Sequence, residues 1–170
     1  PHPSPVGEPL VDTEIQVTLA LGDHLTALET ISTHITAALR VSPPSADEWL
    51  MYASQAAAEL VEHGDGRERD EALRLLAVIE AARGLDPLPF APVGPLDVVH
   101  PAFGALHAAQ RARCAGAVAE LDQLWEAACT ATLAAGLRYE HARAQYRLAH
   151  HLLTRGHDRA RASAALVTAR

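Results

Sequence analysis

Three glycines near the C-terminal end stand at equal intervals, and they constrain the fold more than any other feature of the chain. Gly116, Gly136 and Gly156 are each 20 residues apart, and Ala-rich segments with Leu, Trp and Tyr at helical intervals lie between them. Glycine readily takes the left-handed backbone conformation that ends a helix, so a glycine directly after a periodic segment indicates a helix C-terminus. Equal helices joined by short turns are typical of an array of helical hairpins.

The same interval recurs in the N-terminal half, where Gly64 and Gly84 are also 20 residues apart. A helix that ends at Gly64 should begin at the capping box Ser45-Ala46-Asp47-Glu48, because the serine hydroxyl and the glutamate carboxylate can satisfy two amides of the first turn. A second helix should run from the charged turn 65–70 to Gly84. The apolar face predicted for the first of these helices is made of Trp49, Tyr52, Ala53, Ala56 and Leu60.

The helices between the later glycines each show one apolar stripe at the spacing of an α-helix. Many positions in these stripes are alanine, which allows neighbouring helix axes to approach closely. We expect Trp125 to lie in the core. The three predicted stripes are Val118, Leu121, Trp125, Ala128 and Thr132; Ala142, Tyr146, Ala149 and Leu153; and Ala162, Ala165, Leu166 and Ala169.

Two proline-rich segments divide the chain. Residues 1–9 contain four prolines and are predicted to form a linker or disordered tail, and residues 85–101 contain five and are predicted to cross between an N-terminal helical part, 10–84, and a C-terminal helical-repeat part, 102–170. The start of the N-terminal part is ambiguous, because its apolar residues alternate as in a strand over 15–21. We predict helix there, since its surroundings are helical, and strand is the alternative.

The segment around the last two glycines resembles a known kind of repeat. Tyr139-Glu140-His141-Ala142-Arg143-Ala144, the following Tyr146-Arg147-Leu148-Ala149, and Asp158-Arg159-Ala160 after Gly156 are similar to a tetratricopeptide-type helical pair. The similarity is greatest to the repeat region of large actinobacterial transcriptional regulators of the LuxR family that carry an ATPase core, in which a tryptophan also lies on the preceding helix, as Trp125 does. The resemblance implies a tetratricopeptide-like α-solenoid, with an ATPase before this segment and a DNA-binding helix-turn-helix after it.

The charge is unevenly distributed. The formal net charge is −7, which argues against a nucleic-acid-binding module. Residues 1–100 have a balance of −11 and residues 101–170 one of +4. In the second part, Arg143, Arg147, His151 and Arg155 recur every four residues along one predicted helix. They are the candidate surface for an acidic partner helix or an anionic ligand, and a solvated outer face is the alternative interpretation.

Sequence motifs for catalysis and metal binding are absent. None of the ten histidines belongs to a His-Glu-x-x-His or Glu-x-x-His motif, there is no Cys-x-x-Cys, and all 14 basic residues are arginine, which excludes the lysine of a phosphate-binding Walker loop. His157-Asp158 is the dipeptide of one class of helical phosphohydrolase, but we interpret it as a turn with Asp158 capping the last helix. Cys114 and Cys129 should be reduced thiols. The sequence therefore predicts no catalytic residues, no cofactor and no bound metal.

Taken together, these patterns predict an all-α chain of antiparallel helical hairpins that form a tetratricopeptide-like α-solenoid, interrupted by the proline-rich segment. The predicted function is protein interaction and signal sensing within a larger cytoplasmic transcriptional regulator, without catalysis. A helical domain that binds a small-molecule inducer is one alternative. A helical hydrolase is the other, which clustering of His100, His107 and His141 with acidic groups would favour. Apolar residues on more than one side of 157–170 suggest a homodimer through this C-terminal helix.

Overall fold

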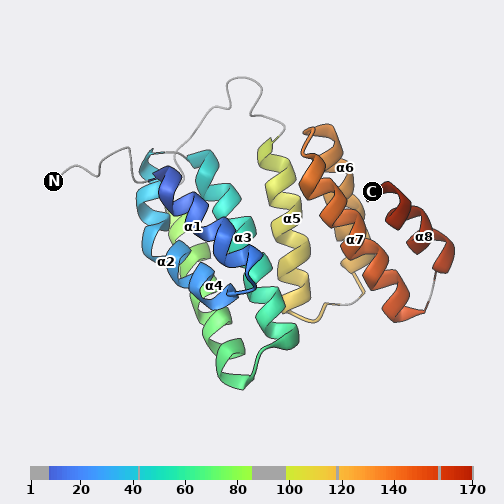
Figure 1. Cartoon of the computed structure of the whole chain (residues 1–170), viewed down its shortest axis with the longest axis horizontal. Coiled ribbons are helices and arrows are strands. Elements are labelled where there is room, and N and C mark those ends of the chain that lie inside the picture. The colour runs from blue at the N-terminus through green and yellow to red at the C-terminus, as the bar shows by residue number, and fades with distance from the viewer. Residues whose placement is uncertain (1–7, 42, 86–98, 118, 157, 170) are drawn as a thin grey trace. The chain divides into compact units, whose positions relative to one another are not determined.

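The computed structural model describes residues 8–41, 43–85, 99–117, 119–156 and 158–169, and every regular element in these ranges is an α-helix. The prediction of an all-α fold is therefore confirmed. None of these helices combines the length and the apolarity that crossing a membrane requires. The helices are α1 (Glu8–Ala20), α2 (His24–Val41), α3 (Pro43–His63), α4 (Gly66–Leu85), α5 (Val99–Cys114), α6 (Leu121–Ala134), α7 (Arg138–Arg155) and α8 (Arg159–Thr168) (Figure 1).

The chain forms two compact units, Pro1–Phe90 and Ala91–Arg170. The first contains α1 to α4 and the second contains α5 to α8. The point of division falls within the proline-rich sequence 85–101. Each unit is described by itself below.

In the first unit, α2 packs against α1, α3 and α4, so it lies at the centre of a small helical bundle. Two polar contacts tie the outer helices to α3: the indole Nε1 of Trp49 donates to Asp12 on α1 at 3.3 Å, and Arg83 on α4 pairs with Asp47 at 2.7 Å. The predicted face of α3 is buried as expected. Large side chains that are at most 2% exposed in this core include Ile15, Leu28, Ile31, Ile35, Trp49, Leu76 and Ile79.

In the second unit, each helix packs mainly against the next one in the chain, α5 on α6, α6 on α7 and α7 on α8. Three residues separate α6 from α7 and α7 from α8, so consecutive helices must reverse direction to pack in this way. The stripe predicted for α6 is confirmed from Leu121 to Thr132, and Trp125 is 1% exposed. Val118, the first residue of that stripe, lies outside the described residues.

Glycines end the helices of the second unit as the spacing predicts. Gly116 and Gly136 have φ angles of +63° and +70°, in the left-handed region. The residue after each closes a paired hydrogen-bond pattern, Ala117 N–H to Ala112 O at 2.9 Å and Leu137 N–H to Thr132 O at 3.0 Å. These bonds satisfy carbonyls that the helix end would otherwise leave open.

Gly84 behaves differently from the glycines of the second unit. Its φ is not positive, and α4 continues through it to Leu85, so the predicted stop at Gly84 is wrong by one residue. The helix that precedes Gly64 does end at His63. A glycine in a sequence permits a left-handed turn but does not require one.

The first helix begins earlier than predicted. Helix α1 starts at Glu8, inside the segment 1–9 that was predicted to be a linker, and residues 1–7 lie outside the described residues. Pro9 is tolerated because the amide it lacks is one of those that a helix N-terminus leaves unpaired. The ambiguous segment is helical, as predicted. Gly22, with a φ of +79°, follows the end of α1. The side chain of Asp23 then caps the start of α2 by accepting from Thr26 N–H at 3.3 Å.

The same effect of proline shifts two further boundaries. Helix α3 begins at Pro43, so Ser45 lies inside the first turn and is not the N-cap that the capping box predicted. Helix α5 begins at Val99 and contains Pro101, although 85–101 was predicted to be free of helix. Proline is compatible with a first turn because its φ is already near the helical value.

Candidate functional site

Helix α7 buries a different face from the one predicted. Its buried side chains are those of His141, Ala144, Leu148, Ala149 and Leu152. In the predicted stripe, Tyr146 and Leu153 are instead 53% and 49% exposed. The error arose because the apolar pattern was aligned on Tyr146, whereas the buried face of α7 begins with a histidine, His141.

His141 is buried because the end of α6 satisfies its imidazole. Its Nδ1 lies 2.9 Å from the carbonyl oxygen of Cys129 and 3.3 Å from the hydroxyl of Thr132. A carbonyl can only accept, so Nδ1 carries the proton and donates to Cys129. The Thr132 hydroxyl in turn donates to the carbonyl of Ala128 at 2.7 Å. A hydrogen-bonded polar group of this kind costs little to bury.

The exposed face of α7 carries a line of aromatic, basic and apolar side chains, which we call the α7 seam. The aromatic and apolar members Tyr139, Tyr146 and Leu153 are 67%, 53% and 49% exposed. The spacing of the seam is alternately four and three residues, the pattern by which one helix presents a straight line of side chains to another helix. The members of the α7 seam are Tyr139, Arg143, Tyr146, His150 and Leu153.

Two ring contacts organise the α7 seam internally. The guanidinium of Arg143 lies over the ring of Tyr139, 5.5 Å from its centroid. The rings of Tyr146 and His150 are stacked with centroids 6.4 Å apart. A guanidinium held against an aromatic face stays charged and open on its other face. The seam therefore presents a cation between two exposed tyrosines.

The four predicted partner residues do not form one line. Because a helix turns about 100° per residue, steps of four residues rotate by about 40° each, and Arg143 and Arg155 lie about 120° apart around the axis. Arg143 belongs to the α7 seam, whereas the side chain of His151 is only 11% exposed and faces Asp122 on α6. Arg147 is half-buried and Arg155 is exposed, and both make contacts of their own. That these four residues bind an acidic partner stays a prediction.

The pair formed by His151 and Asp122 links α7 to α6. The Nε2 of His151 lies 2.9 Å from Oδ1 of Asp122, but the two groups are not aligned as a hydrogen bond, and neither atom has another hydrogen-bond partner among the described residues. Burial lowers the pKa of His151 below 6.5, and this effect outweighs the opposite influence of the Asp122 carboxylate. His151 is therefore a structural contact between helices.

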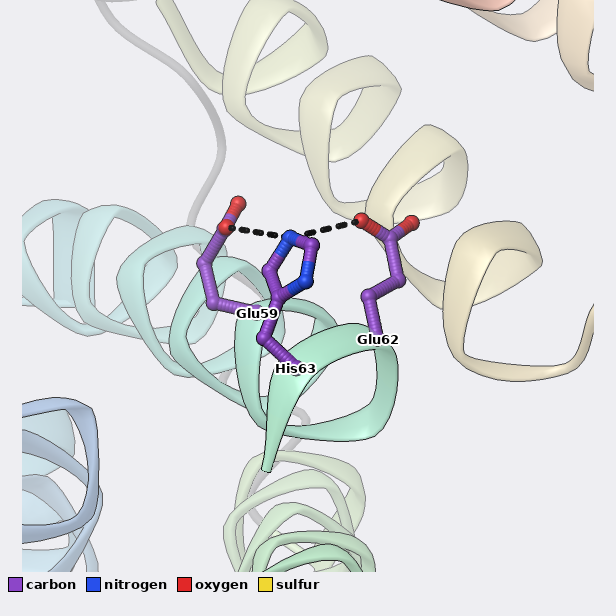
Figure 2. A group of neighbouring side chains, drawn as sticks. All are labelled: Glu59, Glu62 and His63. Atoms are coloured by element: carbon purple, nitrogen blue, oxygen red, sulfur yellow. Dashed lines mark ion pairs between the residues drawn. The ribbon is translucent and has the colours of Figure 1, made fainter. Parts of the chain in front are cut away.

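Among the described residues, a single group of three potential metal ligands comes together, at the end of α3. Figure 2 shows the imidazole of His63 between two carboxylates, with Nε2 4.0 Å from Glu59 and 3.8 Å from Glu62. In the sequence these residues form the pattern Glu-x-x-Glu-His. This pattern contains no Glu-x-x-His motif, so the group was not predicted. A nitrogen and two oxygens suit zinc, but all three ligands come from one helical turn and the His63 side chain is 73% exposed.

The remaining candidate residues lie apart. His100 and His107 are half-buried on α5, and they do not join His141 in a metal-binding group within the described ranges. Cys114 and Cys129 are free thiols, as predicted, and burial raises the pKa of Cys129 to about 11, so this thiol is a poor nucleophile. Asp158 caps α8 by accepting from Arg161 N–H at 2.9 Å, also as predicted, and His157 lies outside the described residues.

Comparison with known proteins adds no further guide to the site. No family model matches the chain, and neither the curated proteins nor the solved structures include a significant match to it. The α7 seam, which the structure alone reveals, is thus the most distinctive candidate for a functional surface.

Proposed function

We propose that this chain is a protein-interaction module and that the α7 seam is its docking surface. The observation that carries this proposal is the straight line of exposed side chains on α7, in which three large aromatic or apolar groups flank an arginine. Tyrosine and arginine are the residues most often found at the energetic centres of protein interfaces.

The charge of α7 favours an acidic partner. The helix contains four arginines and one glutamate, and the arginine of the seam is the half-buried Arg143. An amphipathic helix with apolar residues at alternate spacings of three and four and with carboxylates beside them would match this surface. We therefore still propose an acidic partner, as the sequence suggested. The residues proposed to bind it are now those of the α7 seam.

The larger context proposed for the module is a cytoplasmic LuxR-type transcriptional regulator, and its fold a tetratricopeptide-like α-solenoid. The regulator rests on the resemblance of residues 115–170 to the repeats of that family, and the solenoid rests also on the 20-residue glycine interval. The sequential packing of α5 to α8 supports the solenoid, because a repeat array packs each helix on its neighbours in the chain. The proposed role is to receive a partner signal, without catalysis.

The test is a titration of the full chain with synthetic helical peptides, followed by NMR or fluorescence anisotropy. One peptide has leucines at heptad spacing flanked by glutamates, and its control has the same leucines flanked by lysines. The glutamate peptide should bind and the lysine peptide should not. Arg143→Glu should abolish binding, and Leu133→Glu, which alters a 67% exposed side chain on α6, should leave it unchanged. Equal binding of both peptides, or indifference to Arg143→Glu, would refute the proposal.

A further inference from the structure

Exposed apolar side chains gather on a second helix as well as on α7. Ten large apolar side chains are exposed in the described parts of the chain, and six of them lie on the outer faces of α1 and α7. On α1 and the turn that follows it, Leu10, Val17 and Leu21 are 70%, 50% and 79% exposed. With Glu14 between them they form a line that we call the α1 seam. Clustered exposure of this kind marks an interaction surface.

We propose that the α1 seam of one copy of this chain docks on the α7 seam of a second copy. This inference rests on the function proposed above and names the partner helix. The α1 seam has successive spacings of four, three and four residues, and the α7 seam begins with the same series from Tyr139. Two helices with equal spacing can pack in register along their whole shared length.

A parallel, in-register alignment pairs each position with one of matching chemistry. Leu10 meets Tyr139, and Val17 meets Tyr146, so the apolar groups of α1 cover the two exposed tyrosines. Leu21 meets His150, which already stacks on Tyr146. The second position brings Glu14 to Arg143. The one acidic residue of the α1 seam thus meets the one arginine of the α7 seam.

The charges of the whole helices agree with this pairing. Helix α1 contains three acidic residues and no basic one, and α7 contains four arginines and one glutamate. Opposite charges attract across an interface and also steer the encounter. Arg143 already has one face of its guanidinium on Tyr139, so its edge remains suited to a carboxylate.

Pairing of like seams is less favourable. Two α1 seams packed in parallel would set Glu14 against Glu14, and two α7 seams would set Arg143 against Arg143. Antiparallel packing of two α7 seams would bring Arg143 to His150 and would place no carboxylate opposite the arginine. The mixed pair is the combination that places opposite charges at matched positions.

A contact between two different surfaces has a distinct consequence. A copy that uses its α1 seam in one contact still has its α7 seam for another, so association continues into a closed ring of two or more copies or into open chains. Two copies joined by one such contact can therefore still associate with further copies, unlike a two-fold pair formed through α8.

The first experiment is sedimentation of the full chain over a wide concentration range. The average mass should rise with concentration, and Val17→Lys or Tyr146→Glu should each weaken association by about tenfold or more. Val17→Lys sets a cation against the arginine-rich helix, and Tyr146→Glu sets an anion against the acidic one. An equimolar mixture of the two variants retains one intact seam of each kind, so it should form dimers and nothing larger.

The second experiment exchanges the charges. Glu14→Arg alone and Arg143→Glu alone should each weaken association. The variant that carries both changes should recover most of the affinity, because an arginine at position 14 then faces a glutamate at position 143. Circular dichroism and urea unfolding of every variant show that loss of association is not loss of fold. Leu133→Glu, on a different exposed helix face, is the matched control and should associate like the parent.

Each alternative has its own outcome. A chain that stays monomeric at every concentration overturns this inference, while binding of the acidic peptide in the previous test would still support the function proposed for α7. Loss of association with Val167→Glu, but not with the seam variants, would assign the contact to α8 and also overturn it. A double charge exchange that recovers nothing would show that Glu14 and Arg143 do not meet.

Discussion

Asp122 in the first turn of α6 and His151 in the penultimate turn of α7 stand with Oδ1 and Nε2 2.9 Å apart. They are 29 positions apart in the sequence, and only the reversal of direction at Gly136 brings them together. The histidine is mostly buried at this contact, and burial holds its pKa below 6.5. The stability of the second unit should therefore depend on pH through this pair.

The pH dependence has a definite sign. Below pH 6.5 the unfolded chain binds a proton at His151 more readily than the folded chain does, so the free energy of unfolding should fall as the pH falls through this window. His151→Gln removes the titrating group, and its stability should decline less than that of the parent between pH 7.5 and pH 5. Urea unfolding at a series of pH values measures the free energy of unfolding of the parent and of the variant. Parallel curves would show that His151 does not contribute, and a parent that gains stability in acid would show that Asp122 dominates.

Trp125→Ala should strongly destabilise the protein. The side chain is 1% exposed at the centre of α6, and removal of a large aromatic group from a packed core costs roughly 3–5 kcal/mol. Urea unfolding followed by circular dichroism gives the loss. Tyr146→Ala removes a ring that is 53% exposed, so in the monomer it should cost about 0.5 kcal/mol or less. Equal losses in the two variants would mean that Trp125 is not a core residue.

Two glycines should respond to alanine in opposite directions. Gly136 has a φ of +70°, where a side chain costs roughly 1–2 kcal/mol, so Gly136→Ala should lower the free energy of unfolding by that amount. Gly104 lies inside α5 with ordinary helical backbone, and a Cβ there meets nothing within 4 Å. Gly104→Ala should therefore stabilise the protein by about 0.5–1 kcal/mol. Changes of the same sign in both would contradict the assigned backbone conformations.

Removal of metal ions should leave the fold unchanged. The group formed by Glu59, Glu62 and His63 draws its ligands from one exposed turn, and the helix around it is held by its packing against α2 and α4. Thermal melts with and without a chelator should coincide. If the chelator lowers the melting temperature, the same melts on His63→Ala will show whether this group is responsible, because that variant should no longer respond.

Much of the backbone followed from the sequence. The 20-residue interval predicted where helices of the second unit end, because a left-handed C-terminal residue is a local preference of glycine that Gly116 and Gly136 both satisfy. Helix type was also predictable, even for α1, where local alternation had suggested a strand. The residues at which the helices begin were harder to predict. Proline both interrupts and begins helices, and local sequence did not distinguish the two at Pro9, Pro43 and Pro101.

The faces of the helices depended on more than local pattern. For α6 the apolar periodicity pointed to the buried side, since all of its core positions are apolar or small except Thr132. For α7 it did not, because the core accepts His141 as long as the carbonyl of Cys129 and the hydroxyl of Thr132 are present to bond it. Those groups come from another helix, so the sequence of α7 cannot reveal them.

What the sequence by itself determined is the helical class, the glycine stops of the second unit and the burial of Trp125, since all three rest on preferences of residues and their near neighbours. What only the tertiary structure decided is which side of α7 and α1 faces outward, and hence the two seams. Periodicity places the apolar residues of α7 on two adjacent stripes and cannot choose between them. The choice depends on the total free energy of packing against α6, in which a satisfied histidine replaces an apolar residue and leaves Tyr139, Tyr146 and Leu153 exposed.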